Sequence, residues 1–290
     1  MILIGENLNI MSKTLGPALR GRDPGPIQEM AKQETEAGID YIDLNIGPAR
    51  KAGDELMAWV VNTVQEVTNK PLSLDTTNAV AMEAGLQVCK GTALINSISP
   101  ERVDVELPFV QKYNSDMIGL LWGLDGMPRD ADERAMLTMD LVMQANSMDI
   151  PNEKIWIDPI VSPISVEINQ VKACLEFMSM LQEIAPGCKS TVGLSNISNG
   201  TPEQLRPYLN RTYLIMLMKY GLYSAIVDAF DDEIKKIARG EMPEIVSLVH
   251  RMMEGEKPDF SSLSQKELEY AKTVRVLNGE TLYSHSWLEI

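Results

Sequence analysis

The chain of 290 residues and 32.2 kDa carries 26 lysine and arginine residues against 41 aspartate and glutamate residues, which gives a formal net charge of −15. So acidic a chain has no basic stripe for phosphates, which argues against a nucleic-acid partner. Length alone would allow two domains, but a single α/β barrel of this size is common. We therefore expect one domain over residues 1–290, with an insertion near residues 241–264.

The cysteines and histidines exclude further classes of protein. Cys89, Cys174 and Cys188 form no CxxC pair and have no nearby histidine, so the sequence supports neither a disulfide framework nor a zinc site. The two histidines, His250 and His285, come late in the chain, and we expect no bound metal. The first residues lack a basic leader, and no stretch approaches the ~18 apolar residues of a membrane span. These features predict a cytoplasmic protein without a membrane partner.

Short apolar, β-branched runs alternate with longer helical patterns along the chain, which is typical of repeated βα units and a parallel sheet. We expect strands at Ile2–Gly5, Tyr41–Asn45, Leu72–Asp75, Ala93–Asn96, Met117–Leu121, Ile155–Asp158, Thr191–Leu194 and Ala225–Asp228. We expect helices at Pro26–Ala37, Glu55–Thr68, Ala79–Cys89, Val103–Lys112, Ala131–Met148, Ile168–Ile184 and Pro207–Tyr220. Eight strands with intervening helices predict a (β/α)₈ TIM barrel.

An open, doubly wound sheet is the competing architecture, and it would place a glycine-rich phosphate turn after the first strand. Residues Gly5–Asn9 offer only one glycine there. Beyond residue 228 the alternation of strand and helix patterns becomes less regular. Asp231–Arg239 predicts an eighth helix, Glu241–Ser264 is interpreted as an insertion in the last βα unit, and Gln265–Leu277 resumes helical spacing. Padding or a dimer-facing flap is at least as good an interpretation of the insertion as a direct active-site role.

Two recurring patterns have simple structural interpretations. Methionines at helical spacing, such as Met136, Met139 and Met143, are interpreted mainly as core filling. The acidic run Asp231–Glu233 is interpreted as a solvated first helical turn.

Polar segments recur where the strands should end. They are GEN at Gly5–Asn7, DLN at Asp43–Asn45, LDTTN at Leu74–Asn78, INS at Ile95–Ser97, IDP at Ile157–Pro159 and GLSN at Gly193–Asn196. Because the carboxyl ends of parallel barrel strands meet on one face, these side chains should line one polar cup that is almost free of cations. For any single residue, capping a helix or bracing a loop is an equally good alternative role.

Asp75, Asn96 and Asp158 each follow a short apolar strand, so two carboxylates and one carboxamide should point into the cup. This set suits a planar ligand with a fork of N–H donors beside a carbonyl, and the edge of a pterin has that pattern. The rival interpretation is an acid/base pair in which Asp75 and Asp158 hydrolyse a substrate, and no cluster of aromatic residues for a sugar supports it. After the seventh strand, neutral Asn196 stands where a phosphate would favour Lys or Arg.

Eight short motifs in chain order together resemble the methyltetrahydrofolate:corrinoid protein methyltransferases. They are GEN-x-N at Gly5–Asn9, DLNIGPA at Asp43–Ala49, LDTTN at Leu74–Asn78, AMEAGL at Ala81–Leu86, INS at Ile95–Ser97, WIDPIV at Trp156–Val161, GLSNIS at Gly193–Ser198 and LNRTYL at Leu209–Leu214. The resemblance implies a pterin-binding barrel of the dihydropteroate synthase type, usually a homodimer. It also implies methyl transfer between N5 of tetrahydrofolate and the cobalt of cobalamin carried by a separate corrinoid protein.

The resemblance also implies roles for particular residues. By motif position, Asp75, Asn96 and Asp158 would hold the pterin, and Asn196 would be the catalytic residue that hydrogen-bonds N5. Further substrate-binding positions carried over from the family are Asp43, Asn199 and Arg206. Asn7 is a departure, because members of the family typically have Arg after the first Gly-Glu.

Three functions stay open on the sequence. Dihydropteroate synthase would share the fold and the pterin edge, but it needs basic side chains for a departing pyrophosphate, and Asn196 speaks against that. A non-catalytic pterin-binding barrel would not need Asn196. The chain has no DxHxxG corrinoid motif, so a methyltransferase of this kind would act on a corrinoid held by another protein, in either direction.

Overall fold

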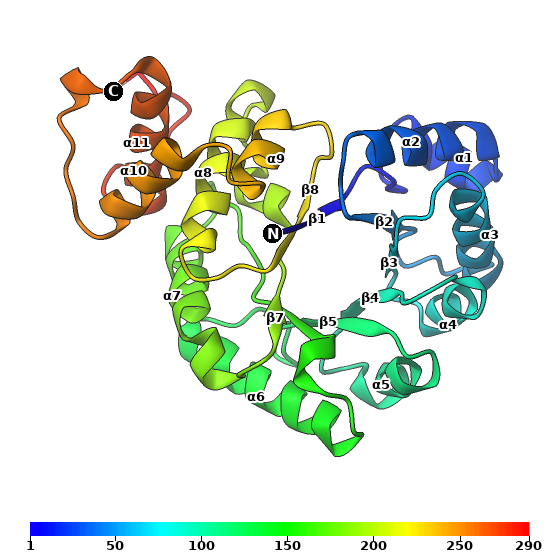
Figure 1. Cartoon of the computed structure of the whole chain (residues 1–290). Coiled ribbons are helices and arrows are strands. Elements are labelled where there is room, and N and C mark those ends of the chain that lie inside the picture. Colours follow the sequence, from blue (N-terminus) through cyan, green and yellow to red (C-terminus); the bar gives the residue numbers. More distant parts are fainter. Residues whose placement is uncertain (290) are drawn as a thin grey trace.

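Eight parallel strands form the centre of the molecule, and helices surround them (Figure 1). This computed structural model describes residues 1–289. The strands are β1 (Ile2–Gly5), β2 (Tyr41–Asn45), β3 (Leu72–Asp75), β4 (Leu94–Ile98), β5 (Asp116–Leu120), β6 (Ile155–Asp158), β7 (Lys189–Ser190) and β8 (Ser224–Val227). Their order in the sheet is β7-β6-β5-β4-β3-β2-β1-β8. A parallel bridge between Gly193 and Ile226 joins the two ends, so the predicted (β/α)₈ TIM barrel is confirmed.

The outer layer follows the predicted helical segments closely. It contains α1 (Leu15–Gly21), α2 (Pro24–Glu36), α3 (Gly53–Gln65), α4 (Ala79–Val88), α5 (Val103–Lys112), α6 (Ala131–Ser147), α7 (Ile168–Ile184), α8 (Arg206–Met218), α9 (Asp232–Ala238), α10 (Pro243–Met253) and α11 (Gln265–Leu277). Short 3₁₀ helices occur at η1 (Asn152–Lys154), η2 (Leu194–Ser198), η3 (Glu203–Leu205) and η4 (Phe260–Ser262). Of the helices, α1 and α10 are additions to the prediction.

Strand alternation sorts the apolar side chains into two cores. A large cluster fills the space between strands and helices, while Ile4, Leu94, Ile118 and Trp156 form a separate cluster. These four residues come from β1, β4, β5 and β6, and strand residues of one parity face the barrel interior. The barrel centre is therefore a packed core rather than a channel.

The seventh strand differs from the prediction. The sequence places it at Thr191–Leu194, but β7 is only Lys189–Ser190, and Leu194 already begins η2. Thr191 and Val192 still make one backbone hydrogen bond each, to Ile157 on one side and Ile226 on the other, of 2.9 and 2.8 Å. The chain turns away after Gly193, because residues 194–198 adopt a helical turn that carries the GLSN segment over the end of the barrel.

The segment predicted as an insertion, Glu241–Ser264, contains helix α10. Pro243 occupies the first turn of this helix, and Gly255 follows its end with a positive φ of 95°. Both residues thus mark helix boundaries, which is their usual role. Helices α10 and α11 pack on the outer side of α8, at the edge of the molecule in Figure 1.

The interpretation of one methionine cluster as core filling is wrong. On α6, Met136, Met139 and Met143 are 54%, 51% and 66% exposed. The helix instead turns a different face, with Thr138 and Leu141, to the core. The methionines form an apolar stripe on the solvent side, because equal helical spacing exists on every face of a helix.

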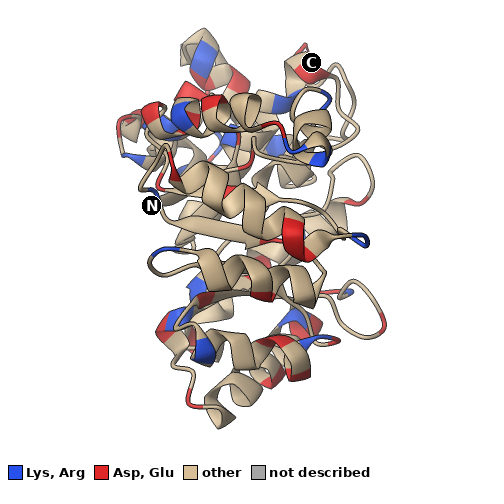
Figure 2. Cartoon of the chain, turned by 90° about the vertical axis from the view of Figure 1, so that its right-hand side faces the viewer, with Lys and Arg blue, Asp and Glu red and all other residues tan. Residues whose placement is uncertain are grey.

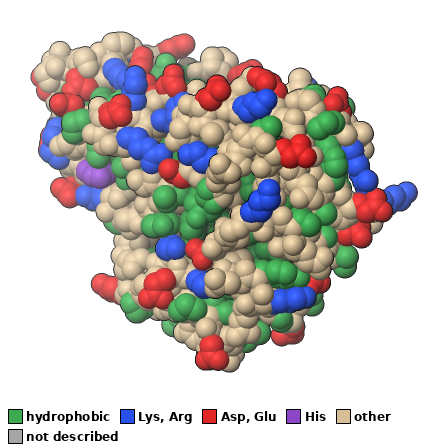
Figure 3. All heavy atoms as spheres, turned by 45° about the vertical axis from the view of Figure 1, so that its right-hand side comes forward, with side chains coloured by type: hydrophobic (Ala, Val, Ile, Leu, Met, Phe, Trp, Pro, Cys, Tyr) green, Lys and Arg blue, Asp and Glu red, His purple; other side chains and the backbone are tan. Residues whose placement is uncertain are grey.

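Charged side chains lie mainly on the helices and loops, as Figure 2 shows. On the face drawn in Figure 3, basic and acidic side chains are interspersed rather than gathered into a basic stripe. Over residues 1–289, every helix is too short or too polar to cross a bilayer.

Candidate functional site

The polar residues at the barrel mouth continue the strand faces that fill the interior. Ile4, Leu94 and Trp156 belong to the interior cluster, and each is followed two positions later by Glu6, Asn96 or Asp158. Because side chains alternate along a strand, residues two apart point the same way. The polar side chains therefore rise from the interior core to the carboxyl ends of the strands, where barrel enzymes place their sites.

Asp43 and Asn96 meet at one side of this mouth. The side-chain amide of Asn96 donates to Oδ1 of Asp43 at 3.0 Å, and the hydroxyl of Ser73 donates to the same oxygen at 2.6 Å. Burial raises the pKa of the Asp43 carboxyl to about 6, although these two hydrogen bonds favour the charged form. Asp43 is therefore a buried support that orients Asn96.

Asp75 lies beside this pair. It is in register with Asn45 of β2 and with Asn96 of β4, and the amide of Asn45 donates to its carboxyl. Burial raises the pKa of Asp75 well above its ordinary value, the nearby Asp43 raises it further, and Arg102 acts in the opposite direction. A ligand that offers N–H donors would satisfy such a carboxyl.

Asp158 ends β6 on the same face. Burial raises its pKa to about 6, while the backbone amide of Ile160 donates to its Oδ1 at 2.8 Å. Ile160 has a positive φ of 65°, which is unusual for a β-branched residue. The fully buried Arg134 of α6 holds this turn by donating to the carbonyl of Pro159 at 2.8 Å. Backbone strain of this kind is often found at functional sites.

Asn196 lies on η2 and is exposed, so its side chain is free to meet a ligand. Its oxygen accepts a hydrogen bond from the amide of Asn199 at 3.1 Å. The guanidinium of Arg206 donates to the hydroxyl of Ser198 at 3.0 Å and to the carbonyl of Ser195 at 3.3 Å. Asn196, Asn199 and Arg206 thus form one structural unit, in which Arg206 braces the 3₁₀ turn that presents Asn196.

Asn7 connects the ends of the first and last strands. Its side-chain nitrogen donates to Oδ1 of Asp228 at 2.9 Å, and its oxygen accepts from the backbone amide of Ala229 at 3.0 Å. Both partners lie just beyond β8. Asn7 therefore fastens the loop after β8 to the end of β1.

Sequence reasoning gives no role to two carboxyl groups near β1, of which Glu6 is half-buried and Glu34 is buried. Glu6 accepts a hydrogen bond from the hydroxyl of Ser195 at 2.6 Å, and burial raises its pKa to about 7. Glu34 of α2 is fully buried, and burial raises its pKa to about 8. An added Cβ on Gly5 would lie closest to Cδ1 of Ile39 and 2.6 Å from Oε1 of Glu34, so both side chains pack directly against this glycine. The GEN motif contains Glu6, but α2 gives no sign that Glu34 reaches the strand.

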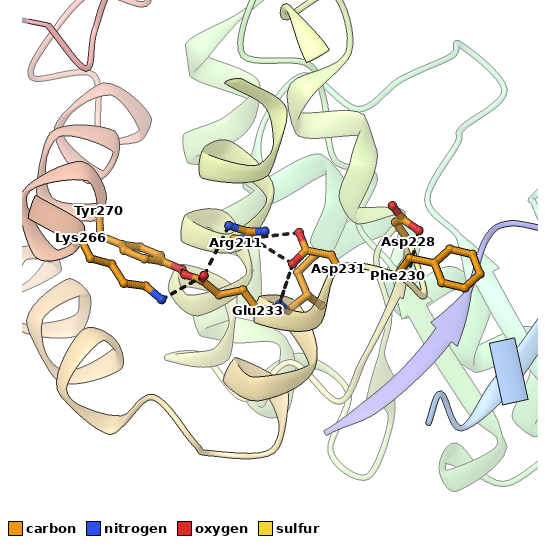
Figure 4. Close-up of polar contacts among 8 residues, drawn as sticks. Arg211, Asp228, Phe230, Asp231, Glu233, Lys266 and Tyr270 are labelled. Carbon is orange, nitrogen blue, oxygen red and sulfur yellow. Dashed lines mark hydrogen bonds and ion pairs between the residues drawn. The ribbon is translucent and has the colours of Figure 1, made fainter. Parts of the chain in front are cut away.

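The loop after β8 is held from outside the barrel (Figure 4). Arg211 of α8 pairs with Asp231 at 2.9 Å and with Glu233 at 3.5 Å. From α11, Tyr270 donates to Glu233 at 2.7 Å, and Lys266 pairs with it at 3.0 Å. Asp231 accepts hydrogen bonds from the first backbone amides of α9. The acidic run is thus a helix start, as predicted, but it is not simply solvated, because Asp231 and Glu233 are tied to α8 and α11.

Within residues 1–289, no group of three or more histidine, cysteine, aspartate and glutamate side chains is arranged to hold a metal ion.

Fold and site together define a barrel whose mouth carries mainly carboxyl and amide groups, with Arg102 near Asp75 and Arg206 near Glu6. The family model described as "Pterin binding enzyme" matches residues 16–228, and the chain belongs to this family. It is 31% identical over 232 residues to the methylcorrinoid:tetrahydrofolate methyltransferase of Eubacterium limosum, covering 79% of this chain and 85% of that protein. The relationship predicted from the sequence motifs is therefore confirmed.

More distant relatives agree with this placement. The chain is 26% identical to methionine synthase of Mycobacterium leprae (strain TN), in an alignment that covers 95% of this chain but only 25% of that longer protein. Dihydropteroate synthase from Thermus thermophilus superposes with a TM-score of 0.61 at 20% identity, over 82% of this chain and 93% of that one. Dihydropteroate synthase from Xanthomonas albilineans with 4-aminobenzoic acid gives a TM-score of 0.63 at 16% identity, over 83% and 92%. At these identities the two structures support the fold alone.

Proposed function

We propose that this protein moves a methyl group between N5 of tetrahydrofolate and the cobalt of a corrinoid carried by a separate protein. The observation that carries the proposal is the relative from Eubacterium limosum, whose alignment covers most of both chains. The carboxyl and amide groups at the barrel mouth support it, because the neutral, flat pterin head of the folate is rich in N–H donors and needs acceptors. Corrinoid and folate are here the two substrates.

Asp75, Asn96 and Asp158 are proposed to hold the pterin ring. The two half-buried carboxyl groups lie at the ends of β3 and β6, and β4 with Asn96 lies between these strands in the sheet. An amide N–H beside an exocyclic amine can donate two parallel hydrogen bonds to one carboxylate. Asn96 offers both a donor and an acceptor, and Asp43 fixes its orientation.

Asn196 is proposed to hydrogen-bond N5 during transfer. When the methyl group leaves, the electron pair of the N–C bond stays on N5, and a nearby donor stabilises the charge that develops there. The exposed position of Asn196 on η2 suits this role, and the neighbouring Asn199 and Arg206 would lie toward the rest of the folate. The same residues serve transfer in either direction, by microscopic reversibility.

Dihydropteroate synthase remains the second candidate, because the solved structures that share the fold carry this name. That reaction expels pyrophosphate, which calls for cations at the upper loops. Neutral Asn196 at the seventh loop supports the methyltransferase instead. Methyl transfer from 5-methyltetrahydrofolate to free cob(I)alamin, without any synthesis of dihydropteroate, is the result that would separate the two.

The experiment that tests the assignment compares rate and affinity in one variant. Losing a single transition-state donor costs on the order of 3 kcal/mol, so Asn196→Ala should slow methyl transfer about a hundredfold. Affinity for 5-methyltetrahydrofolate should survive, because Asp75, Asn96 and Asp158 are untouched. Stopped-flow rates and equilibrium binding measure the two effects. A variant that binds the folate more weakly but transfers at the normal rate once saturated would refute the role of Asn196.

A further inference from the structure

Glu6 and Ser195 form a half-buried, hydrogen-bonded pair that lies next to the proposed catalytic residue. Resting on the proposed function, we propose that Glu6 stores the proton that N5 takes up when the methyl group leaves, and that Ser195 controls when Glu6 releases it. The pair is built from opposite ends of the barrel sequence, since Glu6 follows β1 and Ser195 precedes Asn196 on η2.

The geometry fixes Glu6 at the mouth. Its backbone amide donates to the carbonyl of Val227 in β8 at 2.9 Å, which extends the β1–β8 ladder by one residue. Its side chain has the parity of Ile4, which belongs to the interior cluster, and so points along the barrel toward the site. The hydroxyl of Ser195 donates to Oε1 at 2.6 Å and leaves Oε2 without a hydrogen-bond donor among residues 1–289. One carboxyl oxygen is therefore held, and the other is available to carry a proton.

The charged surroundings keep this proton available near neutral pH. Burial is the largest cause that raises the pKa of Glu6, to about 7, and Ser195 acts against it. The charged and titratable groups that face Glu6 are Asp228 after β8, Arg206 on α8, Asp43 on β2 and Glu34 on α2. Three of these four are acids, so the negative charge of ionised Glu6 adds to theirs and is costly unless Arg206 and Ser195 compensate it. An acid whose pKa lies near the working pH is the most effective proton donor.

The proposed step balances in charge and atoms. The bond between N5 and the methyl carbon breaks, and its electron pair stays on N5. The electron pair of cobalt(I) in the corrinoid forms the new cobalt–carbon bond. N5 takes the proton from Glu6, and the resulting carboxylate keeps the hydrogen bond from Ser195. In the reverse direction, Glu6 recovers the same proton as N5 gains the methyl group.

Glu6→Gln tests the proton without removing the acceptor oxygen for Ser195. The assay is single-turnover methyl transfer from 5-methyltetrahydrofolate to free cob(I)alamin, between about pH 5 and about pH 9, the range that brackets the pKa of the acid. The wild-type rate should fall as pH rises above about 7, because Glu6 then loses its proton in advance. Glu6→Gln should be slower by about a hundredfold and should lack this alkaline decline. Affinity for 5-methyltetrahydrofolate should stay within a few fold of wild type.

A matched control and a second variant keep the test decisive. Glu36→Gln removes one carboxyl from the exposed side of α2 and should leave rate and pH profile unchanged. Ser195→Ala removes a hydrogen bond that lowers the pKa of Glu6, so its alkaline decline should move to higher pH. A purely structural role for Ser195 would change the rate but not the midpoint.

The outcomes are distinguishable. If Glu6→Gln keeps the wild-type rate and the alkaline decline, the decline belongs to N5 itself and Glu6 stores no proton. If Glu6→Gln does not fold, an unshifted midpoint in Ser195→Ala leads to the same conclusion. A wild-type chain that binds no 5-methyltetrahydrofolate and transfers no methyl group at any pH overturns the proposed function, and this inference with it.

Discussion

Asp158 carries a half-buried carboxyl group whose loss of water contacts is only partly compensated by protein donors. Burial raises its pKa to about 6, and the opposing contributions come from the amide of Ile160 and the charge of Arg134. A ligand that donates N–H groups to this carboxyl favours its charged form and lowers its pKa. Binding and proton release are therefore linked at this residue.

Binding of 5-methyltetrahydrofolate should release protons near pH 6. In the free protein, Asp158 is partly protonated below a pH of about 6, and the bound ligand makes it ionise. The release should fade as pH rises well above this pKa, because Asp158 is then already charged. Calorimetry in two buffers with different ionisation enthalpies measures the number of protons released.

Two variants show where the released proton comes from. Asp158→Asn should bind more weakly and release fewer protons. Asp104→Asn, an exposed position on α5, should behave like wild type. Equal proton release by wild type and Asp158→Asn would contradict this explanation.

Alternation alone predicts that Asp75, Asn96 and Asp158 share one face, because each follows a strand whose parity is fixed by burial. It cannot predict the partners of these residues. Asn45 contacts Asp75 on the neighbouring strand, and Asp43 of β2 contacts Asn96 of β4 with β3 between them; such contacts depend on register. The contact of Glu34 with the end of β1 could not be predicted for another reason. Nothing in the sequence of a helix shows which strand its inward-facing side chain will contact.

At the scale of elements, side chains of the outer helices α8 and α11 hold the loop after β8. Asp231 starts α9 by accepting from the amides of Glu233 and Ile234, at 3.0 and 3.1 Å. The same carboxyl pairs with Arg211 of α8. One residue thus combines a helix cap with an ion pair, and the two contributions can be separated.

Asp231→Ala should lower the free energy of unfolding by about 1–2 kcal/mol, since it removes the helix cap and leaves Arg211 partly unpaired. Asp231→Asn should cost less, because asparagine is also a good N-cap and only the ion pair is lost. Urea denaturation of the two variants and wild type gives these differences. If both variants lose the same free energy of unfolding, the ion pair rather than the helix cap supplies the stability.

The errors in predicting individual helices and strands have local causes. The sequence around helix α10 suggests an irregular segment because Pro243 and Gly255 are typical of loops, although they stand at the two ends of the helix. Strand β7 is predicted too late because Thr191–Leu194 has a strand-like composition. Tertiary contacts decide that case, since the chain after Gly193 must turn to pack η2 against α8.

At the scale of the whole molecule, the eight-fold alternation of strand and helix determines the architecture, and composition then limits its ligands. An acidic chain with a cation-poor mouth does not suit phosphate or nucleic acid. Surface contacts are harder to predict, because periodicity shows that a helix has an apolar face without showing which partner covers it. Helix α6 has two such faces, of which the barrel covers only one.

The exposed stripe of Met136, Met139 and Met143 on α6 is the surface through which we expect two copies of the chain to associate. These residues repeat at intervals of three and four, so they lie along one side of the helix. Flexible methionine side chains pack well against a second apolar surface, and exposed apolar patches often mark such interfaces. A stable dimer needs roughly 1,000 Å² of buried surface, so neighbouring side chains must contribute as well.

The double variant Met139→Glu, Met143→Glu should therefore be monomeric under conditions where wild type is a dimer. Glutamates buried at a symmetric contact would lie close to the glutamates of the second copy, and that repulsion adds to the cost of removing their charges from water. Light scattering should give about twice the chain mass of 32.2 kDa for wild type and the single chain mass for the variant. Leu282→Glu changes an 89% exposed residue near the C-terminus and should leave the dimer intact. A wild-type protein that stays monomeric at high concentration, or a double variant that stays dimeric, would show that α6 is not the interface.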